Sequence, residues 1–338
     1  MRALQRSFAT PLNTALTLVI APVVVALAIP FVRWALIDAT WMGTAVTCRA
    51  RVGGACWAFI GHKLPFIVFG LFPPAYQWRA AAATIALLAL VVATLTPRLW
   101  RPALLPAWGV ALAAAYGLMS VAPTQEWGGL PITIMLTAIG LAAGFPVAIL
   151  LALGRRSHRP AVSGVATTIV EVVRGIPLVA VLYLAVLIFP LALPSGIQLD
   201  KLALAQAAVA LFAAAYLAEA VRSGLQMVPK RRLEASLALG LGWGQAMRLV
   251  ILPEALRIVV PSFVSIAAGF FQDTSLIVII GLFDLLNTAR LAAQDPDWLG
   301  FSTEAYLFVG VVYFAGSTLI VRYGRWLERR LSAGAGSR

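Results

Sequence analysis

The sequence contains little charge: only 12% of its 338 residues are Asp, Glu, Lys or Arg, whereas 61% are hydrophobic and the mean hydropathy is +0.92. A soluble globule of this size could not cover its surface with so few polar groups, so the surrounding solvent must be lipid. The net charge of +13 comes from short basic clusters between long apolar runs. Because the basic residues do not alternate with aromatic residues on one face, nucleic acid is not the expected partner.

Side chains that carry common enzyme chemistry are also scarce. Cys48, Cys56, His62 and His158 form no CxxC motif, no HExxH motif and no Cys/His cluster. The sequence therefore predicts no metal site, and a membrane-embedded enzyme has no visible catalytic set. It also lacks a GxxxxGK[ST] phosphate loop, so we expect no nucleotide and no other cofactor on this chain.

Long apolar runs are what the sequence does contain. A helix needs about 20 mostly apolar residues to cross roughly 30 Å of hydrocarbon. The segment from Trp57 to Phe72 is shorter and is interrupted by His62, Lys63 and Pro65, so we interpret it as an interfacial or re-entrant segment. By this measure the sequence predicts an all-α membrane protein with about eight transmembrane helices, at 12–32, 80–96, 103–122, 131–153, 161–189, 202–224, 256–282 and 304–321.

Basic clusters indicate the orientation of these helices, because Lys and Arg accumulate in short cytoplasmic loops. Three clusters fall on one side of the last five helices, which predicts a cytoplasmic C-terminus. With eight helices, Cys48 and Cys56 face the oxidising side and could form a disulfide; with nine, they would stay reduced. The clusters are Arg155, Arg156 and Arg159; Arg222, Lys230, Arg231, Arg232, Arg248 and Arg257; and Arg322, Arg325, Arg329 and Arg330.

The expected division of the chain follows the predicted spans. Residues 1–125 form an N-terminal three-helix extension with an external loop, residues 126–328 form a five-helix core, and residues 329–338 form a disordered tail. The core contains a long polar connection at about 225–257. Its middle predicts a short amphipathic helix, a turn at Gly240-Leu241-Gly242 and a second helical piece that ends at Pro253. An exposed pair of helices of this kind is suited to contact with another protein.

The order Glu234-Ala235-Ser236-x3-Gly240-x9-Val250-x-Leu252-Pro253 resembles the EAA loop of ATP-binding-cassette (ABC) importer permeases. That family pattern is Glu-Ala-Ala-x3-Gly-x9-Ile-x-Leu-Pro, so only Ser236 and Val250 depart from it. The polar amino-acid branch of these permeases is resembled by four further segments, 171–178, 215–224, 228–230 and 273–276. The long N-terminal extension resembles the general L-amino-acid permeases within that branch. Two departures are Arg231-Arg232 in place of a usual Gly-Gln and Gln272 in place of a common Lys.

The resemblance implies a multi-pass protein of the bacterial inner membrane that takes up L-amino acids. Its partners would be a second permease subunit (a copy or a paralogue), two cytoplasmic ATP-binding subunits that hold ATP and Mg, and a periplasmic amino-acid-binding protein. The residues implied to couple this chain to the ATPases are Glu234, Ala235, Gly240, Leu252 and Pro253. Glu234 could cap a helix start or meet a basic residue of the ATPase, and Gly240 could allow close approach.

Polar residues inside predicted spans indicate a pathway, because they are costly in lipid. Glu171 and Arg174 share a helical face and could pair with each other or with an amino acid, although a structural ion pair is an equal alternative. Glu219 and Arg222 lie nearer the cytoplasmic surface and are expected to brace the coupling helices. An ion-coupled secondary transporter would also carry such charges but has no reason to display an EAA loop. The candidate pathway residues are Glu171, Arg174, Gln272, Asp273, Thr274 and Ser275.

Overall fold

The structure, a computed structural model, describes residues 9–333 except 52, 97–98, 100–102 and 195. Within these residues nearly all regular structure is helical, and the single strand, β1, is the dipeptide Phe283–Asp284. Six helices in the described part are long and apolar enough to cross a membrane, or seven if one bent pair counts as a span. The multi-spanning α-helical class predicted from composition is therefore confirmed.

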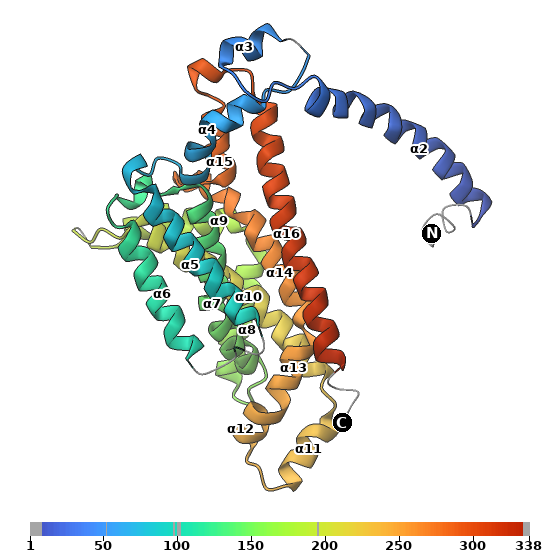
Figure 1. Cartoon of the computed structure of the whole chain (residues 1–338). Coiled ribbons are helices and arrows are strands. Elements are labelled where there is room, and N and C mark those ends of the chain that lie inside the picture. The colour runs from blue at the N-terminus through green and yellow to red at the C-terminus, as the bar shows by residue number, and fades with distance from the viewer. Residues whose placement is uncertain (1–8, 52, 97–98, 100–102, 195, 334–338) are drawn as a thin grey trace. The chain divides into compact units, whose positions relative to one another are not determined.

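The chain divides into two compact units. Residues 65–289 and 309–338 form the larger one, and residues 1–64 with 290–308 form the smaller one. Figure 1 shows the helices of both. Elements wholly within the larger unit are η2 (Pro74–Tyr76), α5 (Gln77–Leu95), α6 (Leu104–Met119), η4 (Thr124–Glu126), α7 (Gly129–Arg155), α8 (Pro160–Gly175), α9 (Leu178–Tyr183), η5 (Leu184–Ile188), η6 (Phe189–Ala192), α10 (Lys201–Met227), α11 (Lys230–Ala238), α12 (Trp243–Ala246), η7 (Met247–Ile251), α13 (Leu252–Ile258), α14 (Val260–Asp273), η8 (Thr274–Ile280) and β1.

Helices α7 and α10 form the centre of the larger unit. They pack closely because small residues face each other: a Cβ added at Gly144 would lie 2.7 Å from the carbonyl oxygen of Ala210. Small residues allow helix backbones to approach in membranes, where the hydrophobic effect does not drive helices together. Their buried residues include Ile132, Met135, Leu136, Ala148, Val209, Phe212, Ala213, Leu217 and Val221.

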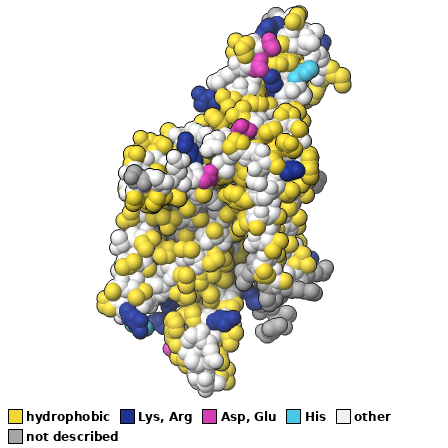
Figure 2. Space-filling model, turned by 90° about the vertical axis from the view of Figure 1, so that its left-hand side faces the viewer, with side chains coloured by type: hydrophobic (Ala, Val, Ile, Leu, Met, Phe, Trp, Pro, Cys, Tyr) yellow, Lys and Arg dark blue, Asp and Glu magenta, His cyan; other side chains and the backbone are white. Residues whose placement is uncertain are grey.

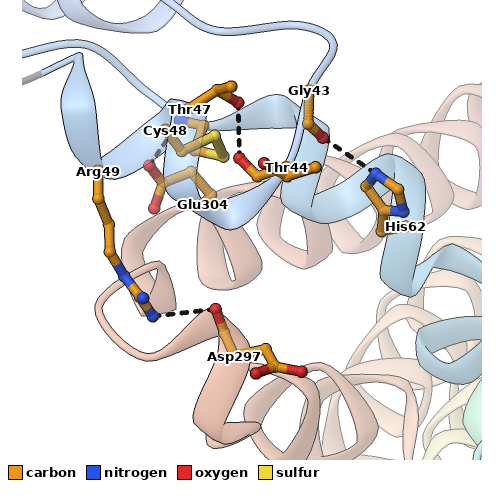
Figure 3. Close-up of a disulfide and its surroundings, with 9 residues drawn as sticks. Gly43, Thr44, Thr47, Cys48, Arg49, His62, Asp297 and Glu304 are labelled. Carbon is orange, nitrogen blue, oxygen red and sulfur yellow. Dashed lines mark hydrogen bonds between the residues drawn. A yellow bond between two sulfur atoms is a disulfide. The ribbon is translucent and has the colours of Figure 1, made fainter.

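The smaller unit contains a disulfide-linked group of segments that we call the cap, residues 38–64 with 290–304. Cys48 and Cys56 form a disulfide with their Cα atoms 5.7 Å apart (Figure 3). Glu304 accepts a 2.9 Å hydrogen bond from the backbone N–H of Cys56. The elements that lie in or enter the smaller unit are α2 (Pro11–Val32), η1 (Arg33–Ile37), α3 (Ala45–Ala50), α4 (Trp57–Phe69), α15 (Leu285–Ala292), η9 (Pro296–Trp298) and α16 (Ser302–Ala333).

The structure groups the N-terminal 125 residues differently from the expected three-helix extension. Helix α2 belongs to the smaller unit and has no buried residue. Helices α5 and α6 pack on each other in the larger unit, and α5 also packs on α7. The grouping differs because the apolar faces of α5 and α6 meet the same bundle that forms the core, whereas α2 presents all its faces outward.

Two predicted spans are not straight helices. The segment 161–189 bends by 107° between α8 and α9, because Ile176 is extended (φ −102°, ψ 135°) before Pro177, as residues before proline usually are. The segment 256–282 is divided into the end of α13, α14 and the 3-10 helix η8. The other predicted spans overlap single helices, although the 16 residues of α6 reach only about 24 Å.

The short segment from Trp57 forms α4, whose 13 residues are too few for an ordinary span. At the other end of the chain, α16 continues to Ala333. Residues 329–333, expected to belong to a disordered tail, are therefore helical. Residues 334–338 lie outside the described residues.

Candidate functional site

The predicted turn of the coupling loop, residues 225–257, is present and requires glycine. Gly240 follows α11 with φ +85°, a left-handed conformation that side chains with a Cβ resist. The N–H of Leu241 donates to Ser236 O at 3.2 Å, and the N–H of Gly240 donates to Leu237 O at 2.9 Å. These two bonds are the pattern of a Schellman motif, which satisfies the last carbonyls of a helix.

The helical piece after the turn does not end at Pro253, contrary to the sequence prediction. It runs from α12 through a π-helical turn, η7, into α13, where Pro253 occupies the first turn. Proline has no backbone N–H to donate. Because a π-helical turn precedes Pro253 and Pro253 lies in the first turn of α13, the helix tolerates this missing donor. Leu252 and Pro253 are therefore part of a continuous connection from the coupling loop into the membrane bundle.

Helix α11 exposes the residues implied to couple the chain to a partner. Glu234 lies in the middle of α11 (Lys230–Ala238), so the alternative that it caps a helix start is wrong. Glu234, Ala235 and Gly240 are all exposed. Figure 2 shows Lys and Arg side chains gathered near the end of the larger unit that carries this loop. Three large apolar side chains are exposed beside them: Leu237 (44%), Leu239 (84%) and Trp243 (54%).

A close helix crossing joins the coupling loop to the bundle. A Cβ added at Gly224 on α10 would lie 2.6 Å from Ala255 O and 2.7 Å from a methyl group of Val259 on the returning segment. Nearby, Arg156 at the end of α7 donates to Leu225 O at 2.9 Å. The backbone of α10 and that of the segment returning from the coupling loop are therefore packed in direct contact, an arrangement that resists sliding.

Glu219 lies at the centre of a charged cluster formed by α7, α8 and α10. Its carboxylate is 2.9 Å from Arg155 and 3.6 Å from Arg174, and it also pairs with Arg222. Arg155 reaches Glu171 at 2.7 Å as well. Glu171 and Arg174, which could have paired with each other, are instead held through Arg155 and Glu219. Glu219 thus joins α10 to α7 and α8, whereas Arg222 pairs with Glu219 on its own helix.

An open cleft of about 650 Å³ lies between the bend after α8, α10 and α14. Arg174 and Asp273 are the charged residues among the described residues that line it. The Arg174 guanidinium carbon stands 5.6 Å from the centre of the Tyr216 ring, which places the cation against an aromatic face. The other lining residues are Gly175, Ile176, Pro177, Leu178, Phe212, Ser265, Ile266, Gly269, Phe270 and Leu276.

The remaining pathway candidates do not line this cleft. Gln272 donates to Ser317 Oγ at 3.0 Å, so its side chain is directed toward α16. Thr274 donates to Phe271 O at 2.9 Å, and Ser275 donates to Gln272 O at 3.0 Å. Glu171 is engaged with Arg155. Among the described residues, no group of three or more His, Cys, Asp or Glu side chains could hold a metal ion.

The comparison with protein families identifies the bundle. Residues 144–333 match the family described as binding-protein-dependent transport system inner membrane component. The chain belongs to this family. This permease is thus a multi-pass protein of the inner membrane and a transporter subunit, not an enzyme. The matched region contains the coupling loop, the charged cluster and the cleft.

Relatives cover nearly the whole permease. The inner membrane amino-acid ABC transporter permease protein YhdY of Escherichia coli (strain K12) is 38% identical over 319 residues, covering 90% of this chain and 85% of that protein. The glutamate/glutamine/aspartate/asparagine transport system permease protein BztC of Rhodobacter capsulatus is 32% identical over 398 residues, covering 96% of this chain and 92% of that protein. The permease is therefore of the amino-acid ABC transporter type.

A solved structure agrees with this assignment. The crystal structure of an amino acid ABC transporter with histidines superposes with a TM-score of 0.53 and 26% identity, covering 60% of this chain and 92% of that chain. Since almost all of that shorter protein is matched by about three fifths of this permease, the present chain has substantial structure beyond the shared fold.

Sequence reasoning missed three structural features of the permease. Arg155 was counted only as a topology signal, although it joins Glu219 to Glu171. Gly224 was quoted only within a motif, although it forms the crossing with Ala255. Asp284 is not among the residues chosen from the sequence, yet it is completely buried. The only available signal was weak: an aspartate between apolar residues, close to a threonine and an asparagine.

Proposed function

We propose that this permease is the pore subunit of an importer for polar or a broad range of L-amino acids, delivered by a periplasmic binding protein. The observation that carries the proposal is the exposed coupling loop, with its glycine-dependent turn at Gly240 and the close crossing at Gly224. A surface of this kind transmits force from an external motor into the bundle. The similarity to YhdY and BztC, both amino-acid permeases, supports the substrate class.

The motor is a separate polypeptide in this proposal. The sequence has no GxxxxGK[ST] loop, so two cytoplasmic ATP-binding subunits would hold ATP and Mg, and this chain would bind no cofactor. The second permease subunit is either a copy or a paralogue. The exposed Leu239 and Trp243 offer apolar contacts, and the neighbouring basic side chains offer ion pairs to an ATP-binding subunit.

The coupling loop and the C-terminus face the cytoplasm, and the cap faces the periplasm. The basic residues at the end of α7, after α10 and in the C-terminal part of α16 support this orientation. The disulfide between Cys48 and Cys56 is the kind of bond that persists on the oxidising side. In this proposal the functional division of the chain is an N-terminal extension, residues 1–125, and a permease core, residues 126–328.

The cleft between α8, α10 and α14 is the proposed amino-acid pathway. A zwitterionic amino acid needs a cation for its carboxylate and an anion for its ammonium group, and Arg174 and Asp273 line the same cleft. The expected effect of Asp273→Asn is a clear loss of uptake with normal membrane insertion. Asp297→Asn on the exposed surface of the cap is the control. Unchanged uptake by Asp273→Asn would remove it from the pathway, and the same test applies to Glu171, Gln272, Thr274 and Ser275.

The direct competitor is an ion-coupled secondary amino-acid transporter, and the energy source separates the two. Purified permease complex is reconstituted in proteoliposomes, and uptake of radiolabelled amino acids is measured with ATP on the side of the coupling loop or with Na⁺ or proton gradients alone. We expect accumulation only with ATP and the binding protein. Gradient-driven accumulation without ATP would contradict the proposed function.

A further inference from the structure

The unusual feature of the larger unit is a buried carboxylate with no cationic partner among the described residues. Asp284 is 0% exposed and takes part in none of the described ion pairs. Oδ1 accepts hydrogen bonds from the backbone N–H of Asn287 at 3.0 Å and from its side-chain amide at 2.6 Å. Oδ2 accepts from the N–H of Leu286 at 3.2 Å and from the Tyr313 hydroxyl at 2.6 Å.

Such a group is costly to bury, because a carboxylate loses its hydration and here gains only neutral donors. A neutral residue could end the loop before α15 at lower cost. Both oxygens of Asp284 are nevertheless fully engaged, by donors from α15 and from α16. The carboxylate therefore fixes the mutual position of several elements rather than a single turn.

The hydrogen bonds extend from Asp284 to η8, the segment that follows α14 in the chain. The Asn287 amide, bound to Asp284, also donates to Ser275 O at 2.9 Å. The Tyr313 hydroxyl, bound to the other oxygen, lies 3.4 Å from Thr274 Oγ1. Thr274 and Ser275 begin η8 (Thr274–Ile280). Two routes thus connect one buried carboxylate to the start of this segment.

A third connection fixes the same group to the centre of the bundle. The N–H of Leu285, next to Asp284, donates to Thr133 Oγ1 on α7 at 3.1 Å. Asp284 itself forms a parallel bridge with Gly129 at the start of α7. The segment Thr274–Ile280 is therefore held against α7, the helix that packs most extensively on α10.

The position of η8 gives this connection a functional meaning. Helix α14 starts just after the coupling loop, runs for 14 residues, or about 21 Å, and ends at Asp273. Asp273 and Leu276 line the cleft. The start of η8 therefore lies along the end of the cleft remote from the coupling loop, where an importer must open to receive substrate and otherwise remain closed.

We propose that Asp284 is a positioning residue for transport: through Asn287 and Tyr313 its carboxylate holds the Thr274–Ile280 segment across the remote end of the cleft, which stays closed until the partner ATPases move the bundle. The inference rests on the proposed function of the permease. Asp284 does not line the cleft, so its proposed effect is on the closing segment.

The test removes one hydroxyl and leaves the fold intact. Tyr313→Phe deletes the bond to Asp284, while the ring keeps its packing on Phe271, with ring centres 5.0 Å apart. Tyr306→Phe is the matched control, because Tyr306 is on the same helix and 48% exposed. Asp284→Asn is a second variant and should act in the same direction, since its amide group places N–H donors against existing donors.

The first measurement is access to the cleft from the periplasmic side. Leu276→Cys in the full complex is treated with a membrane-impermeant maleimide; the disulfide cysteines do not react. Adding Tyr313→Phe should raise the labelling rate in the resting complex by about tenfold, the effect of losing one hydrogen bond to a charged group. Leu299→Cys, 56% exposed on the cap, should label equally in both backgrounds. An unchanged rate at Leu276→Cys would overturn the proposal.

The second measurement separates positioning from simple structural damage. In proteoliposomes, the ATP hydrolysed per amino acid taken up should rise in Tyr313→Phe and in Asp284→Asn, with the amount of assembled complex unchanged, and should stay normal in Tyr306→Phe. A proportional fall of ATPase activity and uptake would contradict the proposal. If the parent complex itself shows no ATP-driven uptake, the proposed function fails. If the parent transports with ATP and the variants show the same coupling as the parent, this inference alone fails.

Discussion

The cap and the coupling loop both expose large hydrophobic side chains, but they are held together in different ways. In the cap, Met42 is 90% exposed, yet the surrounding segments are joined by a disulfide and by a 2.5 Å ion pair between Lys63 and Asp295. In the coupling loop, Leu239 is 84% exposed, and the ion pair across the loop, Arg232–Glu254, is 3.6 Å long, with the Arg232 side chain 59% exposed.

This difference is consistent with the proposed docking of a partner on the coupling loop. A segment joined by covalent and charged cross-links holds its shape unaided, whereas an exposed ion pair contributes little. The coupling loop instead has a turn whose shape depends on the backbone of Gly240 and a close crossing at Gly224. Exposure alone therefore does not distinguish the two regions. The contrast lies between a cross-linked region and the region that we propose to be the docking surface of another protein.

The largest effect should come from the turn of the coupling loop. We expect Gly240→Asp to abolish uptake while membrane insertion stays normal, because a side chain and a charge would stand where the ATP-binding subunit approaches. Uptake by cells and the amount of permease in the membrane are the measurements. Gly300→Asp is the matched control: its φ is +105° and the space around it is also open, but it lies in the cap. Normal transport by Gly240→Asp would defeat the docking assignment.

Removing the disulfide should have a smaller effect, confined to the cap. Cys48→Ser is expected to lower the stability of the closed loop, with a sequence separation of 8 residues, by about 2–3 kcal/mol. Trypsin should then cleave faster at Arg49 and Arg51, while ATP-driven uptake remains.

The control for this prediction is the chemical state of the thiols in the unmodified protein. Cys48 and Cys56 should resist alkylation until a reductant is added. Complete alkylation without reductant would show that the two cysteines are not joined by a disulfide. A loss of uptake in Cys48→Ser with an intact core would contradict the contrast between the two regions.

The smallest effect should come from the pH dependence of the ion pair in the cap. The hydrogen bond from Lys63, followed by that from the backbone of Asp297, lowers the pKa of Asp295 below its ordinary value. A lowered pKa in the folded state means that the stabilisation is complete above about pH 4, the ordinary range of Asp, and is lost as the pH falls through the depressed pKa.

Thermal unfolding of the purified protein, compared with Asp295→Asn, measures this contribution. The stability advantage of the parent should be constant between pH 7 and pH 5 and should shrink below about pH 4. An advantage that persists undiminished at low pH would show that the Lys63–Asp295 pair does not contribute through its charge.

Much of the fold follows from the sequence because lipid imposes a simple requirement. Apolar runs must become helices when no water can satisfy the backbone, so each predicted span overlaps helical structure. The glycine at 240 marked the coupling turn correctly, because a positive φ is nearly a glycine property. Arg174 and Asp273, chosen as costly charges in spans, lie on one cleft.

The remainder depends on contacts that a linear pattern does not record. Hydropathy averages over Ile176 and Pro177 and so hides the 107° bend. The helix continues past Pro253 because a π-helical turn precedes it, and nothing in the composition signals such a turn. Glu171 and Arg174 share a face, but their ion-pair partners, Arg155 and Glu219, come from other helices.

The most direct test is hydrogen–deuterium exchange on the permease with and without its ATP-binding subunits. We predict that backbone amides in residues 230–246 exchange at least about tenfold more slowly when the subunits are bound, since docking suppresses local opening. Amides in residues 38–64 of the cap should exchange at the same rate in both states. Equal exchange of residues 230–246 with and without the ATP-binding subunits would contradict the assignment of the coupling loop as the surface that receives the motor.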